Sequence, residues 1–294
     1  DHYRDALSLE LLSARLQAKR TSGQSTVFTL NTLAVELEDQ GKYTEAEPLY
    51  REALEVRREI LGNSHSDTLL SINNLGMLLK AKGDLAASEL LCREALDGRR
   101  ETLGNRHLST LGSINNLGML LHAKGDLAAS EPLCREALEV KRETLGDRHP
   151  STLSSINNLA VLLKAKGDLA AAEPLYREAL EVMRKTLGDR HPNTLGSINN
   201  LGNLLQVKGD LAAAEPLYRE AVETRREIVG DRHPSTLTSI NNLGVLLKAK
   251  GDLAAAEPLL REAVEGLHKT LGSQHPITLI AIDNLFPRRL RTAG

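Results

Sequence analysis

The sequence contains very few aromatic side chains: it has two Phe, five Tyr and no Trp among 294 residues. Globular cores of this size usually rely on large rings to fill their interior. With 41% hydrophobic residues, this chain must build its core mainly from Leu and Ala, which suits closely packed helices. The scarcity of aromatic residues also argues against RNA binding by stacked bases.

Neither the charge nor the apolar pattern points to a nucleic acid or a membrane as partner. The 37 basic and 39 acidic residues leave a net charge of −2, which lacks the basic footprint of a nucleic-acid binder. No apolar run approaches the roughly 18 to 20 residues of a membrane span.

Only two cysteines, Cys92 and Cys134, are present, and they form no disulfide framework. We therefore predict a cytoplasmic location, and the start at Asp1 rather than Met predicts a fragment of a longer or processed chain.

A unit of 42 residues repeats along most of the chain. Its marker, Ser-Ile-Asn-Asn-Leu, begins at Ser71, Ser113, Ser155, Ser197 and Ser239, and weaker copies stand in phase at residues 29–33 and 281–285. Counted from the Thr that precedes each marker, the repeat predicts three segments. Residues 1–25 form a lone helix, as a half repeat or cap, with a linker. Residues 26–277 form six helical-hairpin repeats, and residues 278–294 hold a truncated repeat and a basic tail.

The unit from Thr152 to Asn193 predicts two helices with one apolar face each. The apolar positions are Leu153, Ile156, Leu159, Ala160 and Leu163 in the first helix, and Leu169, Ala172, Tyr176, Ala179, Leu180 and Met183 in the second. Gly167 suits the left-handed end of the first helix, and Asp168 suits the N-cap of the second. Pro174 removes a hydrogen bond inside the second helix, so we expect a local bend there. Because one helix pair cannot bury two apolar faces alone, the pairs must stack, which predicts an all-α solenoid of antiparallel helix pairs.

Several positions of this unit match the pattern of tetratricopeptide repeats. They are Leu159, Ala160, Gly167, Ala172, Tyr176 and Ala179. The unit is longer than that family's usual length of about 34 residues, and Ile156 replaces the family's early Trp. The longer unit, with its Gly-Asp-Leu and Leu-Gly-Asp-Arg-His-Pro strings, looks like the repeats of kinesin light chains. The resemblance covers roughly residues 26–286 and implies a right-handed superhelical solenoid that binds a peptide or protein on its concave face.

Paired asparagines are the candidate binding residues of each first helix. At about 100° per residue, the direction away from the buried stripe passes between the two members of each pair. The pairs are Asn73 and Asn74, Asn115 and Asn116, Asn157 and Asn158, Asn199 and Asn200, and Asn241 and Asn242. An Asn side chain offers a donor and an acceptor to a peptide backbone of any sequence. The likeness to kinesin light chains implies this role for the second member of each pair. In the alternative interpretation, the asparagines join adjacent repeats and have no role in ligand binding.

Other residues on this face vary from one unit to the next. The candidate contacts are Met77, Met119, Val161, Asn203 and Val245, with Lys80, Lys164 and Lys248 further along the helix. Fixed asparagines beside varied neighbours suggest capture of a peptide backbone with selection by side chains. The lysines would favour an acidic feature on the ligand. Neutral drift on a solvated face explains the variation equally well.

No residue pattern indicates an active site, a metal or a cofactor. Six histidines recur in the loops between repeats, at His65, His107, His149, His191, His233 and His275. Equivalent residues in stacked layers lie at least one helix spacing of about 8–10 Å apart, whereas zinc ligands converge at roughly 2 Å from the ion. We therefore expect these histidines to pack in loops or cap helices. Cys92 and Cys134 stand at core positions and are expected to be buried thiols.

The sequence thus predicts a non-enzymatic adaptor that binds an extended peptide or partner segment. Two alternatives stay open. Open solenoid ends can associate head to tail, which would make the chain a structural or self-assembling element. In the second alternative, the array is the sensor part of a larger signalling NTPase.

Overall fold

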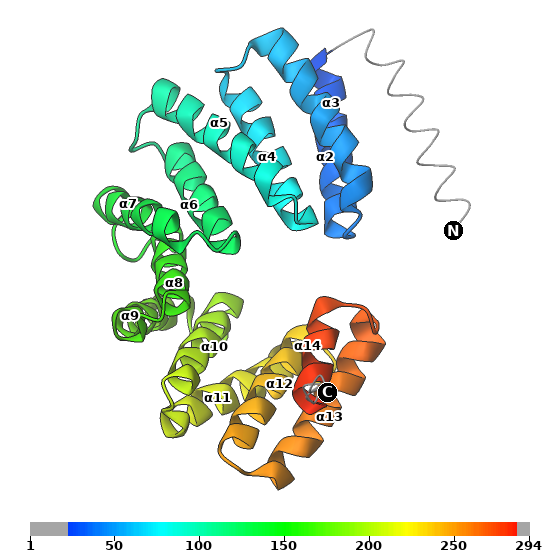
Figure 1. Ribbon diagram of the computed structural model, residues 1–294, viewed down its shortest axis with the longest axis vertical. Helices are drawn as coiled ribbons and strands as arrows, with labels where there is room; N and C mark the ends of the chain where they lie inside the picture. The colour runs from blue at the N-terminus through cyan, green and yellow to red at the C-terminus, as the bar shows by residue number, and fades with distance from the viewer. Residues whose placement is uncertain (1–22, 287–294) are drawn as a thin grey trace, which may run out of the picture. The chain divides into compact units, whose positions relative to one another are not determined.

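The computed structural model describes residues 23–286, which form thirteen α-helices and no strand (Figure 1). The helices alternate between first and second members of a pair. The first helices are α2 (Gly23–Asp39), α4 (Ser66–Lys82), α6 (Leu108–Ala123), α8 (Pro150–Ala165), α10 (Pro192–Val207), α12 (Pro234–Ala249) and α14 (Pro276–Leu285). The second helices are α3 (Tyr43–Leu61), α5 (Leu85–Leu103), α7 (Leu127–Leu145), α9 (Leu169–Leu187), α11 (Leu211–Val229) and α13 (Leu253–Leu271).

The chain divides into two compact units, residues 1–144 and residues 145–294. From α2 to α6 and from α8 to α14, a first helix packs against the second helix of its own pair, and that second helix packs against the next first helix. This is the predicted all-α solenoid of tandem helix pairs. The expected N-terminal helix at residues 1–20 and the basic tail at residues 288–291 lie outside the described residues.

Helix α2 begins at Gly23, so residues 23–25 are helical where the sequence analysis places a linker. The reason is the choice of Thr26 as the first residue of the repeat. Helix α2 thus begins three residues before Thr26, and in later pairs the first helix begins two residues before the equivalent Thr, as α4 does at Ser66. The repeat therefore starts inside its own first helix.

The predicted helix ends are confirmed in the pair α8 and α9. Gly167 has φ of 83°, and the backbone N–H groups of Gly167 and Asp168 donate to the carbonyls of Lys164 and Leu163, which closes α8 as a Schellman motif. The Asp168 carboxylate then accepts from the backbone N–H of Ala171 at 3.0 Å. Asp168 thus helps to end α8 through its backbone N–H and begins α9 through its side-chain carboxylate.

The recurrent histidines are the N-caps of the first helices. In α10, the backbone of His191 is extended, with φ −72° and ψ 137°, and its Nδ1 accepts from the backbone N–H of Asn193 at 3.1 Å. The other five histidines occupy the same position. This confirms the expectation that they cap helices.

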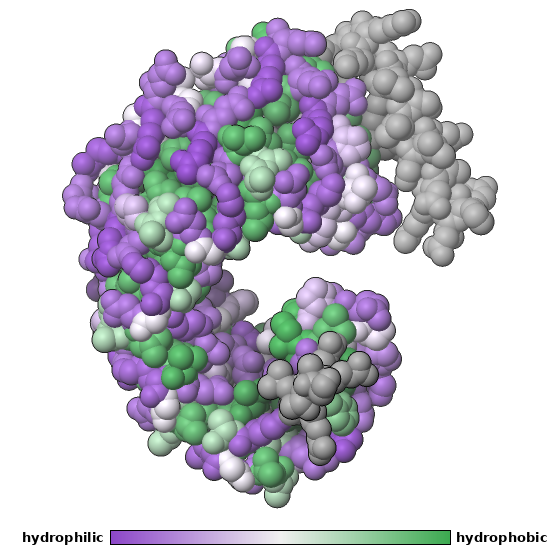
Figure 2. All heavy atoms as spheres, viewed as in Figure 1, coloured by the Kyte–Doolittle hydropathy of each residue, from purple (hydrophilic) through white to green (hydrophobic). Residues whose placement is uncertain are grey.

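The core consists of small and branched apolar residues stacked between helices. In the pair α8 and α9, Ile156, Ala160, Ala172 and Tyr176 are fully buried. Hydrophobic residues show in the seams between neighbouring helices, and hydrophilic residues cover most of the remaining visible surface (Figure 2). The helix α9 continues through Pro174.

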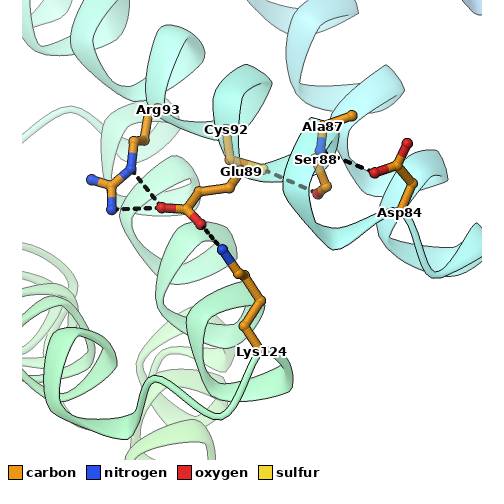
Figure 3. A network of polar contacts seen from close by, with 7 residues as sticks. All are labelled: Asp84, Ala87, Ser88, Glu89, Cys92, Arg93 and Lys124. Carbon is orange, nitrogen blue, oxygen red and sulfur yellow. Dashed lines mark hydrogen bonds and ion pairs between the residues drawn. The ribbon is translucent and has the colours of Figure 1, made fainter.

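The buried residue of the second helix that packs against the first helix differs between repeats: it is Tyr in some and Cys in others. Cys92 and Cys134 are buried, as expected, and have no disulfide. Where they replace Tyr, a Ser replaces the Ala one turn earlier: Ser88 Oγ donates to the carbonyl of Gly76 at 2.7 Å and lies 3.9 Å from Cys92 Sγ (Figure 3). Burial raises the pKa of both thiols, which disfavours the reactive thiolate.

A glutamate on each of the second helices α3, α5, α9 and α11 forms an ion pair with a lysine of the next repeat. Glu89 on α5 accepts from Arg93 one turn later and pairs with Lys124 at the end of α6 (Figure 3). The same arrangement recurs at Glu47, Glu173 and Glu215. The hydrogen bond from Lys124, followed by that from Arg93, lowers the pKa of Glu89 below its ordinary value of 4.5.

Substitution of Glu89 should weaken the fold in a pH-dependent way. Because its folded pKa lies below the unfolded one, its stabilisation is present above the unfolded pKa and is lost as pH falls through the folded pKa. We expect Glu89→Gln to lower the stability of unit 1 by about 0.5–1 kcal/mol at neutral pH, with the difference from wild type vanishing in acid. Urea unfolding at several pH values measures this, with Glu139→Gln at an exposed site as control. A difference that persists unchanged into acid would contradict it.

Two glycines of α6 should respond oppositely to Ala. A Cβ at Gly112 would meet nothing within 4 Å, whereas one at Gly118 would lie 3.0 Å from Cys134 Sγ. Ala is favoured over Gly in a helix by about 0.8–1.0 kcal/mol, so Gly112→Ala should stabilise the chain. Gly118→Ala should be the less stable variant of the two. Thermal unfolding of both gives the comparison, and equal midpoints would refute it.

Candidate functional site

The paired asparagines lie in the middle of the first helices, on the side away from the buried stripe. Within unit 1 they stand on α4 and α6, and within unit 2 on α8, α10 and α12. We call this surface of the first helices the asparagine face. Nine of the ten side chains are half-buried, and Asn241 is buried at 6% exposure. They are therefore partly within reach of a ligand and partly committed to the fold.

Asparagines of consecutive repeats form hydrogen bonds with each other. Asn116 Nδ2 donates to Asn73 Oδ1 at 3.0 Å in unit 1. Asn200 Nδ2 donates to Asn157 Oδ1 at 2.9 Å in unit 2. In each bond the second member of one pair reaches back to the first member of the preceding pair. The structural alternative raised by the sequence, that asparagines join adjacent repeats, is therefore present in the fold.

We call this hydrogen bond between asparagines of consecutive repeats the asparagine bridge. Its partners differ along unit 2. Asn284 Nδ2 on α14 donates to Asn241 Oδ1 at 3.3 Å. Between α10 and α12, however, Asn199 Nδ2 donates to Ser239 Oγ at 3.4 Å, and its Oδ1 is buried without a partner. A bridge of this kind thus depends on side-chain orientation as well as on residue identity.

The variable residues beside the asparagines are also partly used by the fold. Met77, Met119, Val161 and Val245 are half-buried, and Asn203 is exposed. Lys164 Nζ donates to Asn203 Oδ1 at 2.7 Å, and burial lowers the pKa of this lysine. Lys248 Nζ donates to the carbonyl of Asn284 at 2.8 Å, and Lys80 is half-buried. Two of the three candidate lysines therefore contact the following repeat.

Arginines of some second helices form hydrogen bonds with the first helix that follows. The sequence alone did not reveal this feature. Arg99 Nη1 donates to the carbonyl of Ser109 at 3.1 Å and to Ser113 Oγ at 2.7 Å. Arg57 and Arg225 make the same two bonds in their own repeats. We call this arrangement the arginine clamp. Its sequence signal is an Arg that stands 14 residues before the Ser of the repeat marker.

One hollow opens on the asparagine face of unit 2, between α8, the end of α9 and α10. Its volume is about 420 Å³. Its walls include Ser154, Asn157 and Asn158 from α8, Met183 from α9, and Ser197 and Asn200 from α10. A volume of this size lies within the range of ligand pockets.

The described residues show no metal site and no membrane-spanning helix. No group of three or more His, Cys, Asp or Glu within residues 23–286 is placed to hold a metal ion. None of the described helices is long and apolar enough to cross a membrane.

A family model described as Tetratricopeptide repeat matches residues 25–101, 109–185, 154–204 and 193–269. The chain belongs to the tetratricopeptide repeat family. The residues that match cover most of the described helices and include every asparagine pair. Tetratricopeptide repeats form scaffolds of the kind that mediates protein–protein interaction.

Solved structures similar to this tetratricopeptide repeat chain include kinesin light chain-like proteins. A Podosopora anserina putative kinesin light chain with nearly identical TPR-like repeats is 27% identical, with a TM-score of 0.62 over 70% of this chain and 98% of that one. BtubC (BKLC) from P. vanneervenii is 24% identical, with a TM-score of 0.62 over 82% of this chain and 94% of that one.

A more distant neighbour shares the fold alone. A Rap protein complexed with competence and sporulation factor is 14% identical, with a TM-score of 0.64 over 96% of this chain and 79% of that one. Among curated proteins, no sequence matches the chain.

The bridge between Asn157 and Asn200 should be measurable as a coupling. We expect Asn157→Ala and Asn200→Ala each to lower the unfolding free energy by about 1 kcal/mol, because each removes the same hydrogen bond. The double variant should cost less than the sum, with a coupling of about 0.5–1.5 kcal/mol. Urea unfolding of the four proteins measures it. Strict additivity would show that the bridge does not form.

Proposed function

We propose that the asparagine face binds an extended peptide or partner segment, so that the chain acts as a kinesin light chain-like adaptor. The observation that supports this proposal is that the hydrogen bond between asparagines of consecutive repeats uses only part of each amide's hydrogen-bonding capacity. The bond uses one Nδ2 hydrogen of Asn200 and of Asn116, and leaves the Oδ1 of each half-exposed side chain without a bond in the described residues. An amide has two donor hydrogens and an acceptor oxygen, so each of these residues can hold its neighbour and a peptide backbone together.

The bridge also orients the amide for that task. A side chain that is already held loses less conformational freedom when a ligand binds, which favours affinity. Within each unit, successive second asparagines stand 42 residues apart in sequence and on consecutive first helices, so a peptide that crosses these helices meets one amide per repeat. The variable residues Met119, Val161 and Asn203 would then select the ligand's side chains.

Charge supports one further property of the ligand. Lys80, Lys164 and Lys248 stand at the same position of their first helices, near the end of the asparagine face. Lys164 and Lys248 donate to neutral acceptors only, so their positive charge is not cancelled by those bonds. We propose that an acidic group of the ligand lies at this end of the face.

The bridge provides a matched pair of variants for the binding test. Asn157→Ala and Asn200→Ala break the same hydrogen bond and should have similar stability. Only Asn200→Ala removes the amide that we assign to the ligand. Peptides enriched by display selection against the wild-type chain should therefore bind Asn200→Ala at least about tenfold more weakly, while Asn157→Ala keeps most of its affinity.

Two results would contradict this function. A folded wild-type chain that enriches no peptide would remove the proposed ligand. Enriched peptides that bind both variants as well as wild type would place binding on another surface. Fluorescence anisotropy with labelled peptides gives the affinities, and circular dichroism confirms that the variants fold.

A further inference from the structure

The hollow of unit 2 lies where α9 lacks the arginine of the clamp. Three second helices carry the clamp, at Arg57, Arg99 and Arg225. The equivalent residue of α9 is Met183, and the serine 14 residues later is Ser197. Ser197 Oγ has no hydrogen-bond partner among residues 23–286, and the residue is only 3% exposed. Both residues line the hollow.

An unpaired buried hydroxyl is costly, because it has left water without gaining a partner. The chain avoids this cost where α13 meets α14. There Leu267 replaces the arginine and Ala281 replaces the serine, and both side chains are buried. Replacement of both partners by apolar groups can be nearly neutral. At α9 and α10 only the arginine has been replaced, so the acceptor that it would have served is still present.

The hollow matches a guanidinium in its chemistry. In the intact clamps, one Nη1 donates to a serine hydroxyl and to the backbone carbonyl four residues before it. The corresponding acceptors here are Ser197 and the carbonyl of Asn193, and both residues line the hollow. No lining residue carries a charge, so nothing in the wall repels a cation. The C-terminal end of α9, with Met183 and Leu187, adds the partial negative charge of a helix end.

We propose that this hollow receives an arginine side chain of the bound partner, whose guanidinium takes the place of the missing clamp. The inference rests on the proposed function, since the hollow opens on the asparagine face beside Asn157, Asn158 and Asn200. The ligand's arginine donates to Ser197 Oγ and to the Asn193 carbonyl. Met183 yields to let it enter, because an unbranched thioether with three rotatable bonds adapts its shape readily.

This assignment places two features along one ligand. The hollow lies at the first half of α8 and the first half of α10, whereas Lys164 stands near the last turn of α8. A basic side chain at the hollow and an acidic group beside Lys164 are therefore separate contacts.

The probe that tests the hollow is Nα-acetyl-arginine N-methylamide, titrated into the ¹⁵N-labelled full chain and followed by NMR. We expect saturable shifts of the backbone amides of Gly196, Ser197 and Asn200 in the millimolar range. The citrulline analogue has nearly the same shape but no charge, and should bind about tenfold more weakly. The inference is overturned when arginine leaves these amides unchanged or citrulline binds equally well.

Variants of the chain separate the hollow from its surroundings. Met183→Arg supplies the clamp from within, so it should abolish the arginine shifts and raise the urea midpoint. Met183→Ala, which leaves Ser197 without a partner and removes the side chain that must yield, should keep the shifts. Arg99→Met creates the same vacancy in unit 1, and new shifts should appear at Gly112, Ser113 and Asn116. Shifts that survive Met183→Arg would overturn the assignment.

The peptides obtained by display distinguish failure of this inference from failure of the proposed function. Peptides that need Asn200 but bind Met183→Arg as tightly as wild type would remove the hollow from the ligand's path and leave the adaptor function standing. Absence of any enriched peptide, beside a positive arginine titration, would remove the extended ligand and retain the pocket for a basic side chain. Peptides weakened by both Asn200→Ala and Met183→Arg would support both.

Discussion

The structure depends on one constraint: a helix pair in this chain cannot bury its apolar residues without a neighbouring pair. Ile156 and Ala160 of α8 are fully buried, and their helix packs against α9, which in turn packs against α10. A second helix such as α9 therefore buries apolar residues of two first helices. The same demand recurs every 42 residues, which explains why core residues repeat closely and why helix ends use the same His, Gly and Asp in successive pairs.

Local rules made most of the fold predictable from the sequence. Gly167 and Asp168 act within a few residues of their own position, so the end of α8 and the start of α9 could be inferred from residue type. The burial of Cys92 and Cys134 followed from their alignment with Tyr at core positions. The start of α2 at Gly23 was misplaced only because the repeat was counted from Thr26.

The candidate site was less predictable, because its contacts join residues about one repeat apart. The position of each asparagine pair follows from helical spacing, but the bond between Asn157 and Asn200 depends on how two side chains are oriented across a helix interface. The arginine clamp was missed although its Arg and Ser stand at a fixed spacing. Nothing in a single sequence shows that a side chain on one helix reaches the carbonyl and hydroxyl of the next. The hollow arises where Met183 stands in place of the clamp arginine, so the sequence points to it only after the arginine clamp is known.

The placement of the cysteines makes the two units differ in their reactivity towards thiol reagents. Both thiols of the chain, Cys92 and Cys134, belong to unit 1 and are buried against Gly76 and Gly118. A thiol reagent can reach them only when the helices around them separate transiently. The labelling rate of the unmodified chain therefore reports the opening of unit 1 alone, whereas unit 2 stays silent to the same reagent. Native-state dynamics of the two halves can thus be compared without adding a foreign probe to unit 1.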